Sequence, residues 1–468
     1  MRIFLTFVLI ALSFNGFAQK IFKTDSKYVV ITFDGIKTEL ELSVEASPLV
    51  LELECLENKN KGTLSDGKNT SEFTLKKGQK LYFDIHTTDK KIVRVQLVGI
   101  EPNVHFSNEY IKAHKGKNFV EIPEVSELVN ILLVLHKDAE KDHNMFDTKT
   151  TYYQKVKKYF EPYRNHPALD IIHKNMQAPV FNSQQNVHIF PIPAYKYYYA
   201  LKMNACAYEF DNQNRIKHKG TVQQIGKYWN DFDPMKDVAV FEDFARKSNF
   251  RKFYNDNKPY YNELLATFHR LSPVDKMQQW LDKKFGFGYD SYMIYFSPLN
   301  KGAQAATQFE KGDFKQTFMF ICKTTEYEEH SPTLNELLSG WIVFTEIDHN
   351  YVNPLSDKNL QYINRVFSNR NKWAKGDVAQ AYPDPYAVFN EYMTFGLYTL
   401  YAIDHYSQED VMKFLPMYEP MMENVRGFIR FKDFNRALLE RYQKNPDIDM
   451  NALFQYMMYW ALQINDKE

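Results

Sequence analysis

Short stretches with a two-residue hydrophobic repeat dominate the first quarter of the chain. In residues 38–42 leucine and glutamate alternate after a threonine, which is the pattern of a strand that buries one face. Similar runs, rich in β-branched and aromatic residues, are separated by turn clusters such as Asp34-Gly35. Residues 19–122 are therefore predicted to form an antiparallel β-sandwich or barrel. The predicted strands are residues 28–33, 38–44, 49–55, 71–75, 81–85 and 92–98.

The hydrophobic period changes to that of a helix near Pro123. Val125, Leu128, Val129 and Leu132 recur at helical spacing within residues 124–136. Two β-type runs, residues 291–296 and 316–322, interrupt the helices that follow. These helices are predicted over residues 152–163, 194–210, 241–250, 277–285, 333–350, 385–406, 417–444 and 450–464. The fold class is therefore expected to be α+β, with a β-rich domain over residues 19–122 and a helix-rich domain over residues 123–468.

The N-terminus has the character of an export signal. Arg2 precedes an apolar run over residues 3–12, and the small residues Gly16 and Ala18 suit signal peptidase. We therefore expect residues 1–18 to be removed and the protein to be periplasmic or extracellular. No other stretch approaches the ~18 apolar residues of a membrane helix, so no membrane span is expected.

Charge gives no indication of a polyanionic partner. Lysine plus arginine equals aspartate plus glutamate, at 58 each, so the chain has no net field that would favour nucleic acid. Cys55, Cys206 and Cys322 lie far apart in sequence and outside any C-x-x-C pattern. We interpret each as a small core residue.

The predicted helix over residues 333–350 carries most of a zinc-protease motif. In the motif H-E-x-x-H, two histidines one turn apart bind the metal and the glutamate activates a metal-bound water. Glu346 and His349 match this pattern, but Thr345 stands where the first histidine would be. A capping box over residues 333–336 is expected to begin this helix, and Pro354 to end it.

The predicted helix over residues 385–406 carries a solitary acid. Asp384-Pro385 is a typical helix start, and Glu391 is the only ionisable residue between positions 386 and 403. A helix that is apolar on nearly every side is buried. Glu391 should therefore be paired, protonated or bound to a cation, because burying an unpaired charge is very costly.

Together these residues resemble the gluzincin-like peptidase clan and, within it, a family of exported bacterial proteins of unknown function. The resemblance covers roughly residues 124–406. It implies that Glu346 is the general base, that His349 and Glu391 are zinc ligands, and that residues 291–296 are an edge strand along which a peptide pairs. Thr345 departs from the pattern, and its hydroxyl is a weak zinc ligand. Zinc binding is therefore expected to be weakened or lost.

Three functions remain compatible with the sequence. The first is a degenerate metallopeptidase homologue that still binds a peptide or protein; the second is an active zinc metallopeptidase with a non-standard ligand set. The third is a surface or glycan-binding protein that uses the β-rich domain. A buried His349–Glu391 pair without any metal would also explain both side chains. Tyr382 and Tyr386, just ahead of Glu391, either stabilise an oxyanion or pack in the core.

Overall fold

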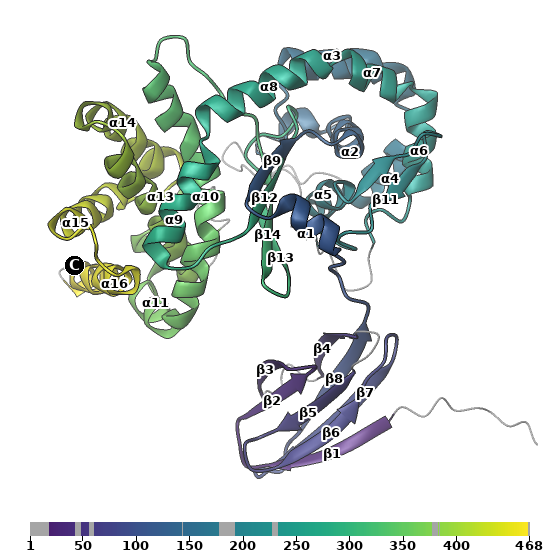
Figure 1. The fold of residues 1–468 in the computed structure, drawn as a ribbon, viewed down its shortest axis with the longest axis vertical. Coiled ribbons are helices and arrows are strands. Elements are labelled where there is room, and N and C mark those ends of the chain that lie inside the picture. The colour runs from purple at the N-terminus through teal and green to yellow at the C-terminus, as the bar shows by residue number, and fades with distance from the viewer. Residues whose placement is uncertain are drawn as a thin grey trace, which may run out of the picture. The chain divides into compact units, whose positions relative to one another are not determined.

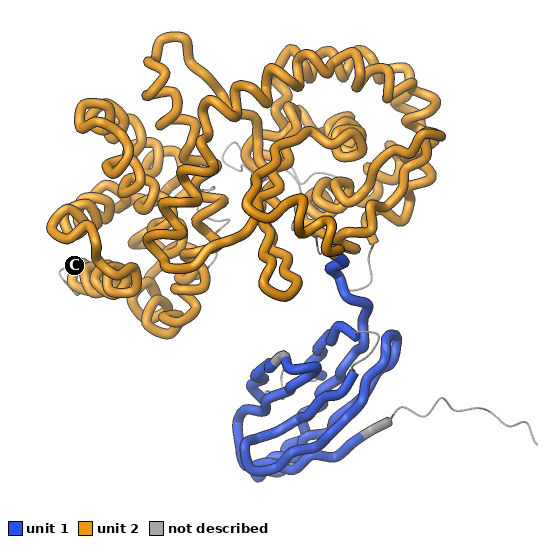
Figure 2. Tube along the Cα trace, viewed as in Figure 1, with its two compact units in different colours: residues 1–105 blue, residues 106–468 orange. Residues whose placement is uncertain are grey.

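Two compact units make up the protein, residues 1–105 and residues 106–468 (Figure 2). The division falls earlier than the change in sequence character near residue 122, because the segment between the two positions pairs with strands of the second unit. The expected signal peptide falls mostly on residues 1–17, which lie outside the described residues. The computed structural model describes residues 18–42, 48–55, 60–142, 144–176, 192–226, 233–376, 382 and 384–466.

Unit 1 consists of two four-stranded sheets that share one core (Figure 1). The sheet β3-β2-β5-β6 is antiparallel throughout, whereas the sheet β1-β7-β8-β4 is antiparallel at its centre and parallel at both outer pairs. Ile31, Phe83 and Val95 lie in the shared core and are essentially unexposed. The unit is therefore a sandwich and not a closed barrel. Its strands are β1 (Ala18–Thr24), β2 (Tyr28–Phe33), β3 (Ile36–Glu41), β4 (Leu49–Glu54), β5 (Lys61–Ser65), β6 (Thr70–Thr74), β7 (Lys80–Thr87) and β8 (Ile92–Ile100).

A mixed sheet of order β13-β14-β12-β9 lies within unit 2. The strands β9 (Lys117–Glu121), β12 (Ser291–Phe296) and β14 (Phe314–Ile321) run parallel, and β13 (Ala305–Lys311) is the antiparallel edge. The expectation that residues 291–296 form an edge strand is wrong, since β12 lies between β14 and β9 and all six of its residues are buried. Strands of a parallel sheet are covered on both faces and therefore tolerate a continuous apolar run.

Helices account for most of unit 2. Figure 1 shows α9 and α10 to one side of the sheet and α2 and α5 to the other. A short hairpin, β10 (Tyr208–Phe210) with β11 (Ile216–His218), follows α5. The helices are α1 (Asn108–His114), α2 (Glu124–Val134), α3 (Thr151–Phe160), α4 (Pro167–Met176), α5 (Ile192–Ala205), α6 (Val238–Lys247), α7 (Phe250–Asp256), α8 (Lys258–Leu271), α9 (Val274–Phe285), α10 (Pro332–Lys358), α11 (Leu360–Val366), α13 (Pro385–His405), α14 (Gln408–Pro420), α15 (Phe431–Lys444) and α16 (Met450–Asp466).

Pro354 does not end α10, contrary to the sequence prediction. The helix continues to Lys358 with Pro354 inside it. A proline lacks the N–H that would bond to the carbonyl four residues earlier. That carbonyl belongs to Asn350, and the Tyr289 hydroxyl donates to it at 3.1 Å. A tertiary hydrogen bond thus replaces the helical one and lets the helix pass through the proline.

Two other predicted helices are divided in the structure. The segment predicted as one helix over residues 194–210 ends at Ala205 and then forms β10. The segment over residues 417–444 contains the end of α14, a π-helical turn η4 (Met421–Val425) and α15. Gly427, which has a positive φ of 77°, lies between η4 and α15 and permits the change of direction.

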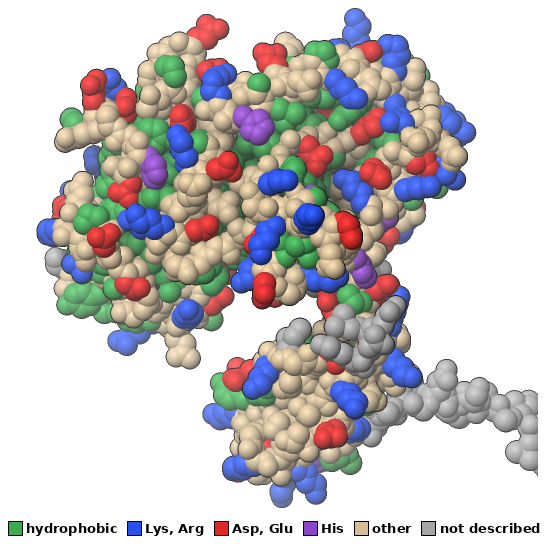
Figure 3. All heavy atoms as spheres, viewed as in Figure 1, with side chains coloured by type: hydrophobic (Ala, Val, Ile, Leu, Met, Phe, Trp, Pro, Cys, Tyr) green, Lys and Arg blue, Asp and Glu red, His purple; other side chains and the backbone are tan. Residues whose placement is uncertain are grey.

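The surface is mixed in charge, as the equal numbers of acidic and basic residues predict. Figure 3 shows both kinds of side chain interspersed over the visible face. None of the helices in the described ranges combines the length and the apolar character needed to cross a bilayer.

Candidate functional site

The helix α10 presents one continuous stripe of side chains that includes the motif. Ser331 caps the helix by accepting a hydrogen bond from the Leu334 backbone N–H at 3.2 Å, with Pro332 in the first turn. The cap is therefore Ser331 and not the predicted capping box over residues 333–336. Residues three and four positions apart share a helix face. The motif stripe comprises Leu338, Trp341, Ile342, Thr345, Glu346 and His349.

The helix α13 packs against α10 and carries the solitary acid, as predicted. Asp384 caps it by accepting from the Ala387 backbone N–H at 2.8 Å, and Pro385 follows in the first turn. Glu391 lies within the long buried stretch of this helix and is 6% exposed. Its carboxylate therefore depends on protein partners for its stabilisation.

His349 and Glu391 lie close together, as the resemblance implies. The imidazole Nε2 of His349 lies 3.4 Å from Oε1 of Glu391. This separation is long for a charge-assisted hydrogen bond, which is typically about 2.7–2.9 Å. Two ligands on one tetrahedral zinc, each bound at about 2.0–2.1 Å, lie roughly 3.3–3.4 Å apart. The spacing therefore matches that of two neighbouring zinc ligands.

Thr345 does not complete a ligand set. Its hydroxyl donates to the backbone carbonyl of Ile342 at 3.1 Å, so the hydrogen is directed back along its own helix. The neighbouring acid Asp348 is fully buried, and neither of its carboxylate oxygens has a hydrogen-bond partner among the described residues. Burial raises the pKa of Asp348 well above its usual value, which favours the neutral acid over a metal-binding carboxylate.

Arg426 lies near the second carboxylate oxygen of Glu391, a neighbour that no sequence pattern indicated. Its Nη2 is 3.8 Å from Oε2 of Glu391 and donates to the Tyr382 hydroxyl at 3.1 Å. Arg426 directly follows η4, where its backbone N–H bonds to the Met421 carbonyl at 3.0 Å. The position depends on the π-helical turn, which no hydrophobic pattern marks.

The electrostatics of this cluster favour a cationic histidine. Burial alone would lower the pKa of His349, but the nearby carboxylate of Glu391 outweighs it and raises the pKa to about 10. His349 and Arg426 therefore both lie next to the carboxylate of Glu391, and the nearby Glu346 also acts on both. Burial raises the pKa of Glu346 to about 7, although His349 and Arg426 oppose the shift.

Lys202 on α5 is a second buried cation that the sequence analysis missed. It is 2% exposed, and its ammonium donates to the Ala303 carbonyl. Burial lowers its pKa to about 7, and Glu346 opposes this shift. Lys202 is one of two lysines in the tyrosine-rich helix α5, and nothing in that local sequence indicates that its charge acts on Glu346.

A catalytic zinc needs about three protein ligands, and the described residues bring together two side chains of suitable type, His349 and Glu391. No group of three or more His, Cys, Asp or Glu side chains in the described ranges is arranged to hold a metal ion. His349 and Glu391 fit such a site in their spacing. The Thr345 hydroxyl is a poor zinc ligand. The Arg426 guanidinium places a positive charge next to Glu391, which disfavours a cation there.

A small pocket adjoins the N-terminal part of the motif stripe. It has a volume of about 200 Å³. Its lining includes Leu338, Trp341 and Ile342 of α10 and also the polar side chains of Lys323 and Thr325. Small-molecule sites usually have about 300–1,000 Å³. The pocket therefore has the size for one side chain rather than for a whole ligand.

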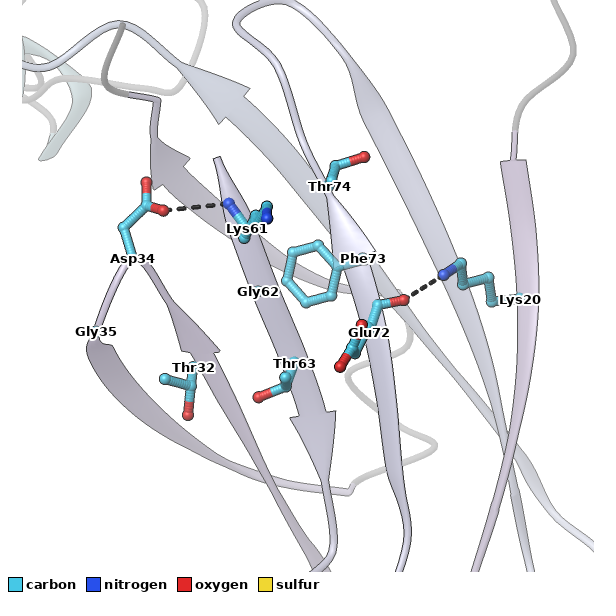
Figure 4. A pocket seen from close by; sticks show the side chains of 10 residues that line it. All are labelled: Lys20, Thr32, Asp34, Gly35, Lys61, Gly62, Thr63, Glu72, Phe73 and Thr74. Atoms are coloured by element: carbon cyan, nitrogen blue, oxygen red, sulfur yellow. Dashed lines mark hydrogen bonds between the residues drawn. The ribbon is translucent and has the colours of Figure 1, made fainter. Parts of the chain in front are cut away.

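A second depression, of about 530 Å³, lies in unit 1 (Figure 4). Thr32 and Thr63 line it, and the Lys20 ammonium donates to the backbone carbonyl of Glu72 at its rim. The aromatic residue of the described lining, Phe73, is only 5% exposed. The depression therefore offers no exposed ring on which a sugar could stack among the residues described there.

Comparison of the chain with protein-family models, with curated proteins and with solved structures finds no match. All three cysteines are free thiols, with Cys55 and Cys206 buried and Cys322 partly exposed.

Proposed function

We propose that this protein is a degenerate relative of the gluzincin peptidases, which keeps the framework of the active site and binds a peptide or protein without cleaving it. The observation that carries this proposal is the arrangement around Glu391. Its carboxylate faces His349 at 3.4 Å and Arg426 at 3.8 Å. A protein cation thus neutralises the charge that a metal would otherwise neutralise.

The arrangement of α10 and the sheet supports a peptidase ancestry. The antiparallel edge strand β13 lies beside α10, where Gln308 donates to the Asn350 side chain. The motif residues Glu346 and His349 lie on the same helix, close to this contact. An exposed sheet edge next to the motif would offer backbone groups to an extended peptide.

The loss of catalysis follows from the ligand set. A catalytic zinc needs about three protein ligands and a water molecule. With Thr345 bonded to its own helix and Arg426 adjacent to Glu391, the two remaining ligands would hold zinc weakly. The expected remaining property is binding, supported by the side-chain-sized pocket on the motif stripe.

Metal analysis and proteolysis of the same preparation test this proposal. The protein, purified and then incubated with zinc and desalted, should retain far less than one zinc per chain and should not cleave casein. Glu346→Gln should leave this result unchanged. Stoichiometric zinc together with casein cleavage that Glu346→Gln abolishes would establish the alternative of an active peptidase with an unusual third ligand.

A further inference from the structure

The strand β9 forms one end of the sheet in unit 2. In the order β13-β14-β12-β9 it pairs with β12 alone, and no other strand in the described ranges bonds to its outer edge (Figure 1). None of its five residues is buried, whereas all six residues of β12 are. A free strand edge presents unpaired N–H and C=O groups, which another extended backbone can satisfy. The outer edge of β9 is therefore available to a further strand.

Helix α9 leaves space beside this edge. A hollow of about 500 Å³ is lined by the start of β9 and by polar side chains of α9. The Asn118 amide reaches across it and donates to the Asp275 carboxylate at 2.7 Å. Successive side chains of a strand point to opposite faces. Because Asn118 faces α9, the side chains of Lys117, Phe119 and Glu121 share the other face of the strand.

A row of aromatic rings ends at this edge. The rings of Tyr110 and His114 on α1 stack with their centroids 3.8 Å apart, and the Phe119 ring lies 4.8 Å from that of His114. Phe119 is the central residue of β9 and is half-buried. Aromatic side chains at opposing positions of two strands stabilise the pair. The edge therefore offers one ring, besides its backbone groups, that an added strand can cover.

The charges of β9 are complementary to themselves. Its sequence is Lys-Asn-Phe-Val-Glu, so a cation and an anion lie at equal distances on either side of Phe119. Neither Lys117 nor Glu121 forms an ion pair with another residue in the described ranges. In an antiparallel pair centred on Phe119, each Lys117 lies opposite Glu121 of the other copy. Opposite charges at opposing positions stabilise a strand pair, and like charges destabilise it. Charged side chains usually protect a sheet edge from pairing, but here their signs favour one register.

We propose that β9 pairs with β9 of a second copy of this chain, antiparallel and about a twofold axis at Phe119. The two four-stranded sheets thereby join into one. A twofold interface uses the same patch on both copies, which the self-complementary charges satisfy. The other edge strand, β13, lacks this property, because pairing about its centre places alanines opposite Glu310 and Lys311. The inference goes beyond the proposed function and does not rest on it.

Sedimentation equilibrium of the full chain tests the proposal. A five-residue strand pair is at the small end of specific interfaces, so we expect a reversible dimer with a Kd of roughly 1–100 µM. Lys117→Glu places acids opposite each other at both ends of the strand pair, and Glu121→Lys does the same with cations. Each variant changes two cross-strand pairs and should weaken the dimer by roughly 5–30-fold.

A mixture of the two variants is the decisive measurement. In an equimolar mixture, opposite charges meet at both positions when one variant pairs with the other, so dimers should form about as tightly as in the native protein. The double variant Lys117→Glu with Glu121→Lys exchanges the two signs and should recover in the same way. The control Glu310→Lys, an exposed position on the other edge strand, should leave the association unchanged.

Three outcomes would overturn the inference. They are a native protein that stays monomeric at about 200 µM, well above the expected Kd, a dimer that neither single variant weakens, and a mixture of the two variants that associates no better than each alone. Recovery in the mixture would also show that both variants are folded, because misfolded chains would not regain the native affinity on mixing.

Discussion

The His349 imidazole and the Glu391 carboxylate, on two different helices, lie 3.4 Å apart. This spacing suits two ligands of one zinc better than a short ion pair. Arg426 occupies the other side of the same carboxylate. Metal binding, stability and its dependence on pH should therefore all respond to changes at His349, Glu391 and Arg426.

Restoring the missing ligand should restore zinc binding only in part. Thr345→His places a second imidazole one turn before His349, but Arg426 still competes for Glu391. We expect the double variant Thr345→His with Arg426→Gln to bind zinc more tightly than Thr345→His alone, by about tenfold or more, since even indirect contacts change metal affinity by ~10–100-fold. Competition with a chelating dye measures this. Equal affinity of the two variants would show that Arg426 does not oppose the metal.

Removing the acid should destabilise the protein more than removing the histidine. Glu391→Gln leaves the buried Arg426 guanidinium without its carboxylate and removes the charge that keeps His349 protonated, which should cost about 3–5 kcal/mol of unfolding free energy. His349→Gln leaves Glu391 still facing Arg426 and should cost less. Urea unfolding at pH 7 measures both. The reverse order of the two variants would contradict the proposed charge arrangement.

The stability contribution of His349 should depend on pH in one direction. Its pKa is raised from about 6.5 to about 10 in the folded protein, chiefly because the effect of Glu391 outweighs that of burial. A raised histidine pKa stabilises the fold fully below pH 6.5, and the contribution is lost as the pH rises towards 10. The difference in unfolding free energy between the native protein and His349→Gln should therefore shrink from pH 6 to pH 10. A constant difference would argue against a cationic His349.

Glu127 on α2 is a second buried acid, and its replacement should stabilise the protein instead of destabilising it. It is unexposed and accepts a hydrogen bond from the Tyr152 hydroxyl at 2.7 Å. Burial raises its pKa to about 7. Ionising Glu127 therefore destabilises the fold increasingly from pH 4.5 to pH 7. Because one pKa unit is worth about 1.4 kcal/mol, Glu127→Gln should be more stable than the native protein by roughly 1–3 kcal/mol at pH 8, and similar to it at pH 4.

Such a gain should be visible in urea titrations at the two pH values. The matched control is Glu124→Gln at the start of the same helix, where the carboxylate pairs with Arg251 at 2.8 Å. This control should not become more stable at pH 8. A Glu127→Gln variant that is less stable than the native protein at both pH values would show that Tyr152 needs the carboxylate.

A substitution at Gly99 would test how closely the backbone segments of unit 1 pack together. A Cβ at this position would lie 2.1 Å from the backbone carbonyl oxygen of Lys76. Backbone hydrogen bonds of Gly99 to Gly78 and Gln79 hold the two segments together, so the carbonyl cannot easily move. Gly99→Ala should destabilise the protein by about 1–3 kcal/mol, as overpacking does. Thermal unfolding measures this, with the exposed Lys80→Ala as control. An unchanged melting temperature would contradict the close approach.

Helices and strands whose residues follow a clear hydrophobic pattern were predictable from sequence. The strands over residues 28–33 and 291–296 have the predicted bounds, and α13 begins at its predicted cap. The resemblance to gluzincins implied the convergence of His349 and Glu391, and the lone acid in a predicted buried helix pointed to Glu391 as the partner. Local patterns were sufficient here because the length of each apolar or alternating run, together with the turn or cap residues beside it, marks the element.

The remaining differences have a tertiary origin. Pro354 lies inside α10 because Tyr289, far away in sequence, bonds to the released Asn350 carbonyl. The role of 291–296 as a central strand depends on its partners, which its own residues do not encode. Arg426 reaches Glu391 only through the π-helical turn before it. Each of these features joins segments that no local periodicity connects.

The π-helical turn before Arg426 has a genetic consequence. Such a turn holds about one more residue than an α-helical turn, and each residue of an α-helix advances by roughly 100° around its axis. Deleting one codon within Met421–Val425 would therefore rotate the guanidinium away from Glu391 while α10 and α13 stayed unchanged. A single in-frame deletion would therefore be enough to produce a related protein in which no arginine lies next to Glu391.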